Sequence, residues 1–254
     1  MIEARAVRIT GKGDVSALSI GTLPVRDAGP GEVRVKVAAA GLNRADVLQR
    51  MGVYPAPAGV PADVPGLEYA GVVEQVGEGV RELEVGDAVM GIVAGGAMAT
   101  HLVVHAREVL RVPKDMPLTE AAAIPEVFLT AYDAVFEQAR LAMGQLLLVH
   151  AVGSGVGTAA LQLGLVAGAE VVGTTRSEDK LVRCRALGLS HGVVARDKSF
   201  AAAFTKETAG RLADVVLDTV GAGYLTDNLK VLAQRGRIVT IGLLAGATGE
   251  LPLG

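Results

Sequence analysis

The pattern of hydrophobic and polar positions changes along the chain. Up to residue 117, short apolar runs alternate with glycine and proline, as in residues 32–38, 71–76 and 98–104. Turn signals such as Gly29-Pro30-Gly31 separate these runs. Short runs bounded by turn residues are typical of β-strands. The pattern therefore predicts a mainly β domain over residues 1–117.

From residue 118 to 254 the pattern predicts alternating strands and helices. The expected strands are 146–150, 170–175, 192–195, 213–218 and 237–241. The expected helices are 119–125, 127–138, 158–167, 178–187, 200–209 and 224–233. The first of these strands is continuously apolar, which fits a parallel strand covered on both faces. Strand–helix alternation of this kind predicts an α/β domain with a doubly wound parallel sheet.

A glycine-containing loop joins the strand 146–150 to the helix that follows it. Glycine lets the backbone approach a pyrophosphate, and the free N–H groups of a helix N-terminus bind its oxygens. Val152 and Ser154 stand where the common dinucleotide fingerprint has its first two glycines. The alternative is a turn needed only for packing. The predicted pyrophosphate contacts are Gly153, Ser154, Gly155, Val156 and Gly157.

The end of the second parallel strand favours NADPH over NADH. NAD-binding proteins usually place an acidic residue there, which binds the ribose 2′-hydroxyl. This chain has Arg176 and Ser177, followed by Lys180. Arginine can bind a 2′-phosphate through two parallel hydrogen bonds. The alternative is a pair of solvated cations at the start of a helix, which Ser177 would cap.

Composition excludes several classes of function. The net charge is only -3 and aromatic residues make up 3%, which argues against nucleic acid and anionic membranes as partners. Cys184 is the single cysteine, so neither an intrachain disulfide nor a cysteine-rich metal site is possible. The charged start is unlike a signal peptide, and no apolar run reaches the roughly 18 residues of a membrane span. We therefore expect a cytoplasmic globular protein.

Several motifs together resemble one family. In chain order they are Gly41-Leu-Asn-Arg-Ala-Asp-Val-Leu-Gln-Arg-Met-Gly-Val-Tyr54, Pro65-Gly-Leu-Glu-Tyr-Ala-Gly71, Val85-Gly-Asp87, Ala121-Ala-Ala-Ile-Pro-Glu126 with Leu129-Thr-Ala131, and Ser154-Gly-Val-Gly-Thr-Ala-Ala160. The chain resembles the zinc-free quinone oxidoreductases of the medium-chain dehydrogenase/reductase superfamily. Within them it is most similar to the p53-inducible quinone oxidoreductase branch.

This resemblance implies a GroES-like β domain followed by a Rossmann-type NADP-binding domain, with the active site in the cleft between them. Zinc-dependent relatives carry a cysteine and a histidine where this chain has Asn43 and Leu67. Neither residue supplies a thiolate or an imidazole, so the resemblance implies no catalytic zinc. Without a Lewis acid, a quinone or another α,β-unsaturated carbonyl compound is the expected acceptor of the hydride.

The resemblance also implies roles for individual residues. Asn43 and Tyr54 would lie beside the nicotinamide and the acceptor carbonyl, where Tyr54 donates a hydrogen bond or a proton. The alternative for Tyr54 is a loop aromatic packed on neighbouring prolines. Thr130 would touch the nicotinamide. The remaining expected cofactor contacts are Asp218, Gly242 and Leu243 at strand ends, and Arg196, which would compensate for a tyrosine that the family has near the 2′-phosphate.

Glu68 is expected to have a structural or cleft role rather than an acid/base role, and the four histidines are expected to be structural. Members of the family usually continue well beyond residue 254, so we expect a piece of a larger protein or a module. An enoyl reductase module of fatty-acid or polyketide synthesis is therefore an alternative function, in which neighbouring modules are the partners instead of a second copy in a homodimer. A further alternative is an NADPH-binding protein, or an incomplete fold, with little turnover.

Overall fold

The change in pattern corresponds to two folded units, Met1–Glu126 and Val127–Gly254. The structure is a computed structural model that describes residues 1–195 and 199–251. The units divide later than the expected boundary after residue 117, because helix α2 (Leu118–Ala121) packs on strands of the first unit. Its Ala121 joins Ala70 and Met90 in a small apolar cluster.

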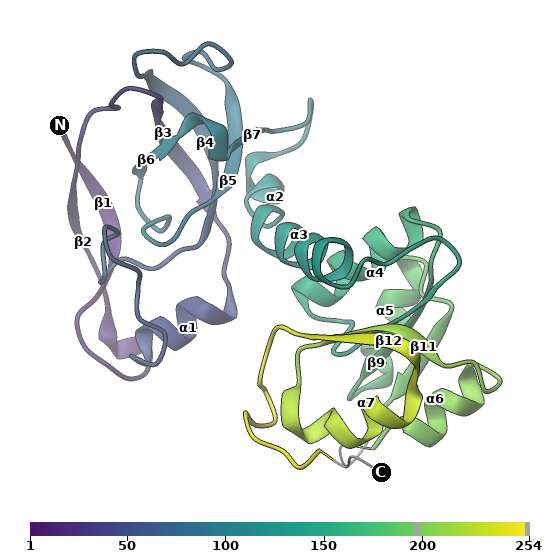
Figure 1. Cartoon of the computed structure of the whole chain (residues 1–254). Coiled ribbons are helices and arrows are strands. Elements are labelled where there is room, and N and C mark those ends of the chain that lie inside the picture. The colour runs from purple at the N-terminus through teal and green to yellow at the C-terminus, as the bar shows by residue number, and fades with distance from the viewer. Residues whose placement is uncertain (196–198, 252–254) are drawn as a thin grey trace. The chain divides into compact units, whose positions relative to one another are not determined.

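A five-stranded antiparallel sheet with the order β6-β3-β4-β5-β7 forms the first unit (Figure 1). Its strands are β3 (Glu32–Ala40), β4 (Glu68–Val76), β5 (Ala88–Ile92), β6 (His101–His105) and β7 (Val109–Arg111). A hairpin of β1 (Ile2–Ile9) and β2 (Leu18–Val25) is separate from this sheet. Short helices are η1 (Val15–Ala17), α1 (Arg44–Arg50) and η2 (Ala106–Glu108). The mainly β unit is confirmed, although β6 begins later than the run 98–104 suggested.

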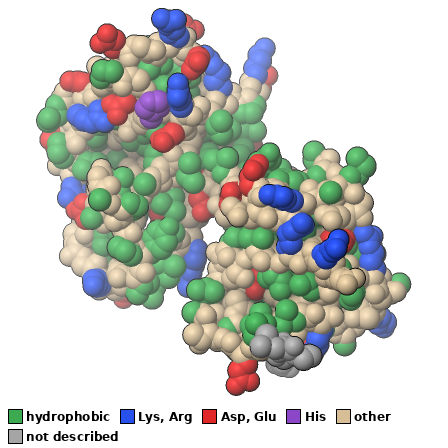
Figure 2. All heavy atoms as spheres, viewed as in Figure 1, with side chains coloured by type: hydrophobic (Ala, Val, Ile, Leu, Met, Phe, Trp, Pro, Cys, Tyr) green, Lys and Arg blue, Asp and Glu red, His purple; other side chains and the backbone are tan. Residues whose placement is uncertain are grey.

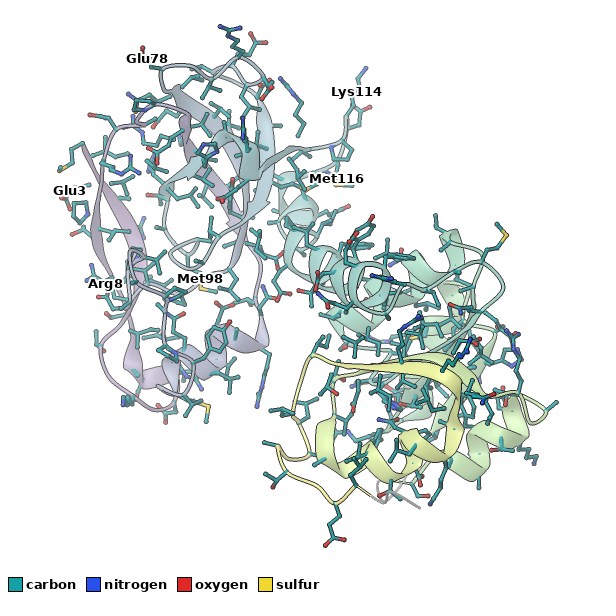
Figure 3. The ribbon with its side chains drawn as sticks, in the orientation of Figure 1. Glu3, Arg8, Glu78, Met98, Lys114 and Met116 are labelled. Carbon is teal, nitrogen blue, oxygen red and sulfur yellow. The ribbon has the colours of Figure 1, made fainter. Side chains whose placement is uncertain are left out.

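Alternate residues of these strands fill the core of the first unit. Val33 and Val35 on β3 face the same side and pack with Tyr69, Val73 and Val89, all buried. This period of two is the reason that short apolar runs form one buried face. Figure 3 shows Lys114 at the tip of the turn between β7 and α2, with Met116 nearer the helix.

A five-stranded parallel sheet with the order β10-β9-β8-β11-β12 forms the second unit. Its strands are β8 (Leu146–Val149), β9 (Glu170–Thr175), β10 (His191–Val194), β11 (Ala213–Asp218) and β12 (Leu232–Thr240). Its helices are α3 (Pro125–Tyr132, of which the first two residues belong to the first unit), the π-helical η3 (Asp133–Gln138), α4 (Gly155–Val166), α5 (Glu178–Ala186), α6 (Ala201–Glu207), η4 (Gly221–Tyr224) and α7 (Leu225–Val231).

Helices cover both faces of this sheet, which confirms the doubly wound α/β prediction. Leu147 and Val149 of β8 pack with residues of η3, α4 and α5, whereas Leu146 and Leu148 pack with α6 and α7. Figure 1 shows α4 and α5 on one side of the sheet and α6 and α7 on the other. The strand order reverses between β8 and β11, and ligands of such sheets bind beyond the carboxyl ends of the strands at this point.

The surface of each unit mixes side chains of all types. Figure 2 shows acidic and basic side chains interspersed with apolar ones on the visible face. Among the helices that the structure describes, none has the length and apolar character needed to cross a bilayer.

Candidate functional site

The glycine loop lies between β8 and α4, at the point where the strand order reverses. Helix α4 begins at Gly155, three residues before the expected start at Thr158, because Ser154 caps it: Ser154 Oγ accepts a hydrogen bond from the Gly157 N–H at 3.1 Å. Within residues 1–195 and 199–251, no group accepts from the N–H of Gly155 or Val156. Gly153, Ser154 and Gly155 are exposed. The loop therefore offers free amide donors to an anion.

Close packing explains two glycines of this loop. A Cβ atom on Gly157 would lie 2.4 Å from the Ala151 carbonyl oxygen, and one on Gly155 would lie 2.8 Å from Cγ1 of Val127. Ala151 has φ 48°, a left-handed conformation that costs a non-glycine residue roughly 1 kcal/mol. Gly155 and Gly157 are therefore needed for close packing, as the alternative interpretation of the glycine turn proposed. This packing role coexists with the exposed amides.

The predicted phosphate ligands follow β9 at the same edge of the sheet. Arg176 and Lys180 are exposed, and the aliphatic part of Lys180 lies over Gly153, whose added Cβ would be 3.2 Å from Lys180 Cβ. This contact brings a lysine to the glycine loop. The expectation that Ser177 caps α5 is wrong in its detail, because Ser177 is the N-cap residue but its side chain makes no capping hydrogen bond. Arg196 lies outside the described residues.

The loops that follow β11 and β12 pack together at this edge. The Asp218 carboxylate is buried, and its Oδ1 accepts hydrogen bonds from the N–H groups of Val220 and Gly221 at 2.7 and 3.0 Å. A Cβ on Gly242 would lie 2.7 Å from the Thr219 carbonyl oxygen, so this position needs glycine. Leu243 is exposed. The geometry gives Asp218 a role in holding the turn after β11, and it leaves Leu243 accessible to a ligand.

Sequence reasoning missed a buried polar chain below these loops. His150 Nδ1 lies 2.9 Å from Thr174 Oγ1, and His150 Nε2 lies 2.6 Å from Asn228 Oδ1. Asn228 Nδ2 donates to Asp218 Oδ2 at 3.1 Å. Burial lowers the pKa of His150, although Asn228 and Asp218 act in the opposite direction. The one available signal was a histidine at the end of an otherwise apolar strand, and Asn228 gave none.

The first unit positions Asn43 through a buried carboxylate. Glu68, at the start of β4, is 2% exposed, and its Oε1 accepts from Asn43 Nδ2 at 2.8 Å. Its Oε2 accepts from the N–H of Glu126, in the first turn of α3, at 2.9 Å. A Cβ on Gly41 would lie 2.0 Å from Glu68 Oε1, so only glycine admits this carboxylate. Glu68 thus orients Asn43 and holds the backbone of Glu126 at the end of the first unit, which agrees with the expected structural role.

Two further carboxyl groups lie in this region. Asp46 accepts hydrogen bonds from the N–H groups of Asn43 and Gly66, both at 2.8 Å, yet burial raises its pKa. Burial also raises the pKa of Glu126, together with the charges of Glu68 and Asp46. At these two positions burial therefore favours the neutral, protonated carboxyl group.

The other candidate residues occupy different surroundings. Tyr54 lies on the loop after α1, is 45% exposed and makes no side-chain hydrogen bond with any described residue. Thr130 lies on α3 and is half-buried. Within residues 1–195 and 199–251, no group of three or more His, Cys, Asp or Glu side chains is placed to hold a metal ion.

Comparison with known proteins gives two family matches. Residues 29–114 match the alcohol dehydrogenase GroES-like domain, and residues 155–254 match the zinc-binding dehydrogenase family. The chain is 41% identical over 223 residues to the pikromycin polyketide synthase component PikAII of Streptomyces venezuelae, a match that covers 87% of this chain and 6% of that protein. The chain therefore spans only a small part of this curated relative.

Two solved structures share the fold across nearly the whole chain. The CurK enoyl reductase has a TM-score of 0.87 and 34% identity over 95% of this chain and 74% of that one. A quinone oxidoreductase of Pseudomonas syringae pv. tomato DC3000 has a TM-score of 0.87 and 29% identity over 98% of this chain and 77% of that one. With its GroES-like domain and its Rossmann-type parallel sheet, the chain belongs to the medium-chain dehydrogenase/reductase superfamily of oxidoreductases.

Proposed function

We propose that this chain reduces the carbon–carbon double bond of an α,β-unsaturated acyl thioester with a hydride from NADPH, as the enoyl reductase domain of a polyketide synthase. The observation that carries the proposal is the likeness to the CurK enoyl reductase over almost the whole chain. The similarity to a polyketide synthase component points to the same acceptor. The sequence left both quinones and other α,β-unsaturated carbonyl compounds open as hydride acceptors, and this proposal chooses acyl thioesters. The proposed partners are neighbouring domains of a synthase.

The second unit fits a dinucleotide phosphate. The N–H groups of Gly155 and Val156 lie in the first turn of α4, where the helix dipole favours an anion, and they have no acceptor among residues 1–195 and 199–251. Gly153 and Ser154 leave the backbone exposed beside them. We assign the pyrophosphate to this loop, and the 2′-phosphate of NADPH to Arg176 with Lys180, because both cations lie at the carboxyl edge after β9.

The first unit would supply the residues around the reacting atoms. When bound, NADPH supplies the hydride that adds to the β-carbon of the thioester. Electrons then move onto the thioester oxygen, and the α-carbon takes up a proton. The Tyr54 hydroxyl is free to donate a hydrogen bond or a proton at this stage. Asn43, held by Glu68, is our candidate in the first unit for contact with the nicotinamide. In the second unit the candidates are Thr130 for the nicotinamide, and Gly242 and Leu243, beside the turn that Asp218 holds, for the ribose.

This proposal does not require zinc. Asn43 and Leu67 occupy the places of the zinc ligands in zinc-dependent relatives, and neither is a zinc ligand of the usual kind. A conjugated thioester accepts a hydride without a Lewis acid, because its own carbonyl group delocalises the charge. We therefore expect activity to survive dialysis against a metal chelator.

A quinone is the second candidate acceptor. The fold match to the Pseudomonas syringae quinone oxidoreductase favours it, as do the motifs that resemble the p53-inducible branch. Quinones and enoyl thioesters both take a hydride at an electron-poor carbon conjugated to a carbonyl group. The same cofactor site and the same Tyr54 would serve either acceptor, so the choice rests on the acceptor pocket.

A direct comparison of acceptors tests the proposal. The purified chain is given NADPH with a crotonyl thioester or with a benzoquinone, and cofactor oxidation is followed by absorbance. Reduction of the thioester with a higher kcat/KM than the quinone is the expected result. Preference for the quinone would establish the second candidate. Tight NADPH binding with neither reaction would reject both and identify a binding protein with little turnover.

A further inference from the structure

A continuous hydrogen-bonded chain runs through the interior of the second unit. It links Thr174 on β9 to His150 after β8, then to Asn228 on α7 and to Asp218 at the end of β11. All four side chains are at most 2% exposed. The rings of Phe200 and Tyr224 pack on His150 with centroid distances of 4.7 and 4.8 Å.

Among these four side chains, the assignment of donors and acceptors starts from Asp218. Its carboxylate already accepts from two backbone N–H groups, so the Asn228 group that faces it is the NH2 donor. Asn228 Oδ1 therefore faces His150 and accepts from Nε2–H. A neutral imidazole protonated on Nε2 has a lone pair on Nδ1, which accepts from the Thr174 hydroxyl. Each polar group is thus satisfied with His150 neutral, the state that burial favours by lowering its pKa.

The hydrogen-bonded side chains contact both loops of the candidate dinucleotide site. His150 directly precedes Ala151, the residue with φ 48° that turns the backbone into the glycine loop. The Thr174 carbonyl oxygen accepts from the N–H of Val152 at 3.0 Å. At the other end, the Asp218 carboxylate holds the turn at Val220 and Gly221. One set of side chains therefore fixes the loop after β8 and the turn after β11 relative to each other.

We infer that Thr174, His150, Asn228 and Asp218 form a positioning network, which holds the strained glycine loop in the geometry that binds the cofactor pyrophosphate. This inference rests on the proposed binding of NADPH at that loop. The four residues act through the backbone of the loop and not by touching the cofactor. A disrupted network leaves buried polar groups without partners and releases the left-handed turn at Ala151, so the free amides of Gly155 and Val156 lose their fixed direction.

The test compares Asn228→Ala with Val231→Ala in the full chain. Both residues lie on α7 and are fully buried, but Val231 contributes only to the apolar core. Both variants are expected to unfold at lower temperature. Asn228→Ala is expected to raise the Kd of NADPH about tenfold in a fluorescence titration, whereas Val231→Ala leaves it within about twofold. Equal Kd values for the two variants would overturn the inference.

A second pair covers the case in which Asn228→Ala does not fold. Thr174→Val keeps the shape of the side chain but removes the hydroxyl that donates to His150, and Thr174→Ser retains that hydroxyl. Weaker NADPH binding by Thr174→Val, with affinity restored in Thr174→Ser, supports the network. Unchanged affinity in Thr174→Val overturns it.

The same titration separates this inference from the proposed function. If the unsubstituted chain binds NADPH while the substitutions leave its affinity unchanged, only the positioning role fails. If the unsubstituted chain binds neither NADPH nor NADH, the proposed function fails, and the inference fails with it.

Discussion

A Cβ atom on Gly157 would lie 2.4 Å from the carbonyl oxygen of Ala151 and 2.7 Å from Cα of Val152. Both neighbours are backbone atoms, which cannot rotate away as the end of a side chain can. The absence of a side chain at Gly157 therefore lets α4 pack directly against the end of β8. This contact sets the direction in which the first turn of the helix presents its N–H groups.

Gly157→Ala should damage the glycine loop. The added methyl group displaces α4 from β8, and overpacking of this kind costs roughly 1–3 kcal/mol. Lower thermal stability and weaker NADPH binding are expected together, measured by thermal unfolding and by titration. Val166→Ala, on the same helix at an 87% exposed position, serves as the control and should change neither. Unimpaired NADPH binding in Gly157→Ala would contradict the role given to this glycine.

Arg176→Ala should weaken NADPH much more than NADH. The guanidinium is proposed to bind the 2′-phosphate, which NADH lacks, so about a tenfold or greater rise in the Kd of NADPH alone is expected. Arg183→Ala removes an exposed cation from the neighbouring helix α5 and is the matched control. Equal losses for both cofactors in Arg176→Ala would remove the phosphate role from this residue.

Tyr54→Phe should lower turnover and leave cofactor affinity nearly intact. Tyr54 is 45% exposed on the loop after α1, and its proposed hydrogen bond forms only as charge develops on the acceptor oxygen. Loss of one such donor reduces kcat by about a hundredfold in comparable cases. Steady-state kinetics with a crotonyl thioester and an NADPH titration provide the measurement. Unchanged turnover would leave Tyr54 as a loop residue packed on its neighbouring prolines.

Glu68→Gln and Glu126→Gln should have opposite consequences for stability. Both oxygens of Glu68 accept hydrogen bonds, so an amide there turns one acceptor into a donor and costs about 1–3 kcal/mol. Because the folded-state pKa of Glu126 is raised, its charge opposes folding at neutral pH, and Glu126→Gln removes that penalty. Chemical denaturation at pH 7 compares the two variants. A Glu68→Gln variant as stable as the unsubstituted chain would refute the role given to this carboxylate.

Asp227 should make the second unit sensitive to acid. Burial acts to raise its pKa, but hydrogen bonds from the N–H groups of Ala201 and Phe200, with the Lys230 ammonium, outweigh burial and lower the pKa from 3.8 to about 2. The ionised form therefore stabilises the fold by roughly 2 kcal/mol above about pH 4, and this contribution is lost as the pH falls towards 2.

Asp227→Asn is the comparison for this pH dependence. It should be less stable than the unsubstituted chain at pH 7 and should lose less stability between pH 4 and pH 2, as followed by denaturation at a series of pH values. If the free energy of unfolding falls equally for the two proteins between pH 4 and pH 2, Asp227 does not cause the loss of stability in this pH range.

The sequence by itself determined the class of fold. Short apolar runs bounded by turn residues predicted the mainly β unit, and strands alternating with helices predicted the parallel sheet. The reason is that a strand with alternating apolar residues buries one face, whereas a continuously apolar strand must be covered on both faces. The glycine loop and the cations after β9 were also visible, since their residue types are local properties of the chain. The helix limits differed: α4 starts at Gly155, three residues before the start expected from the sequence, because the Ser154 hydroxyl caps it.

Only the tertiary structure decided how the polar side chains pair. His150, Thr174, Asn228 and Asp218 come from four separate segments, and nothing in their spacing predicts that a parallel sheet brings them into one buried chain. Likewise, Gly41 reads as an ordinary loop glycine until Glu68 is seen against it. The period of hydrophobic residues is a local property that can be read from neighbouring positions in the sequence. Hydrogen-bond partners depend on which distant segments the fold brings together, so the sequence alone does not identify them.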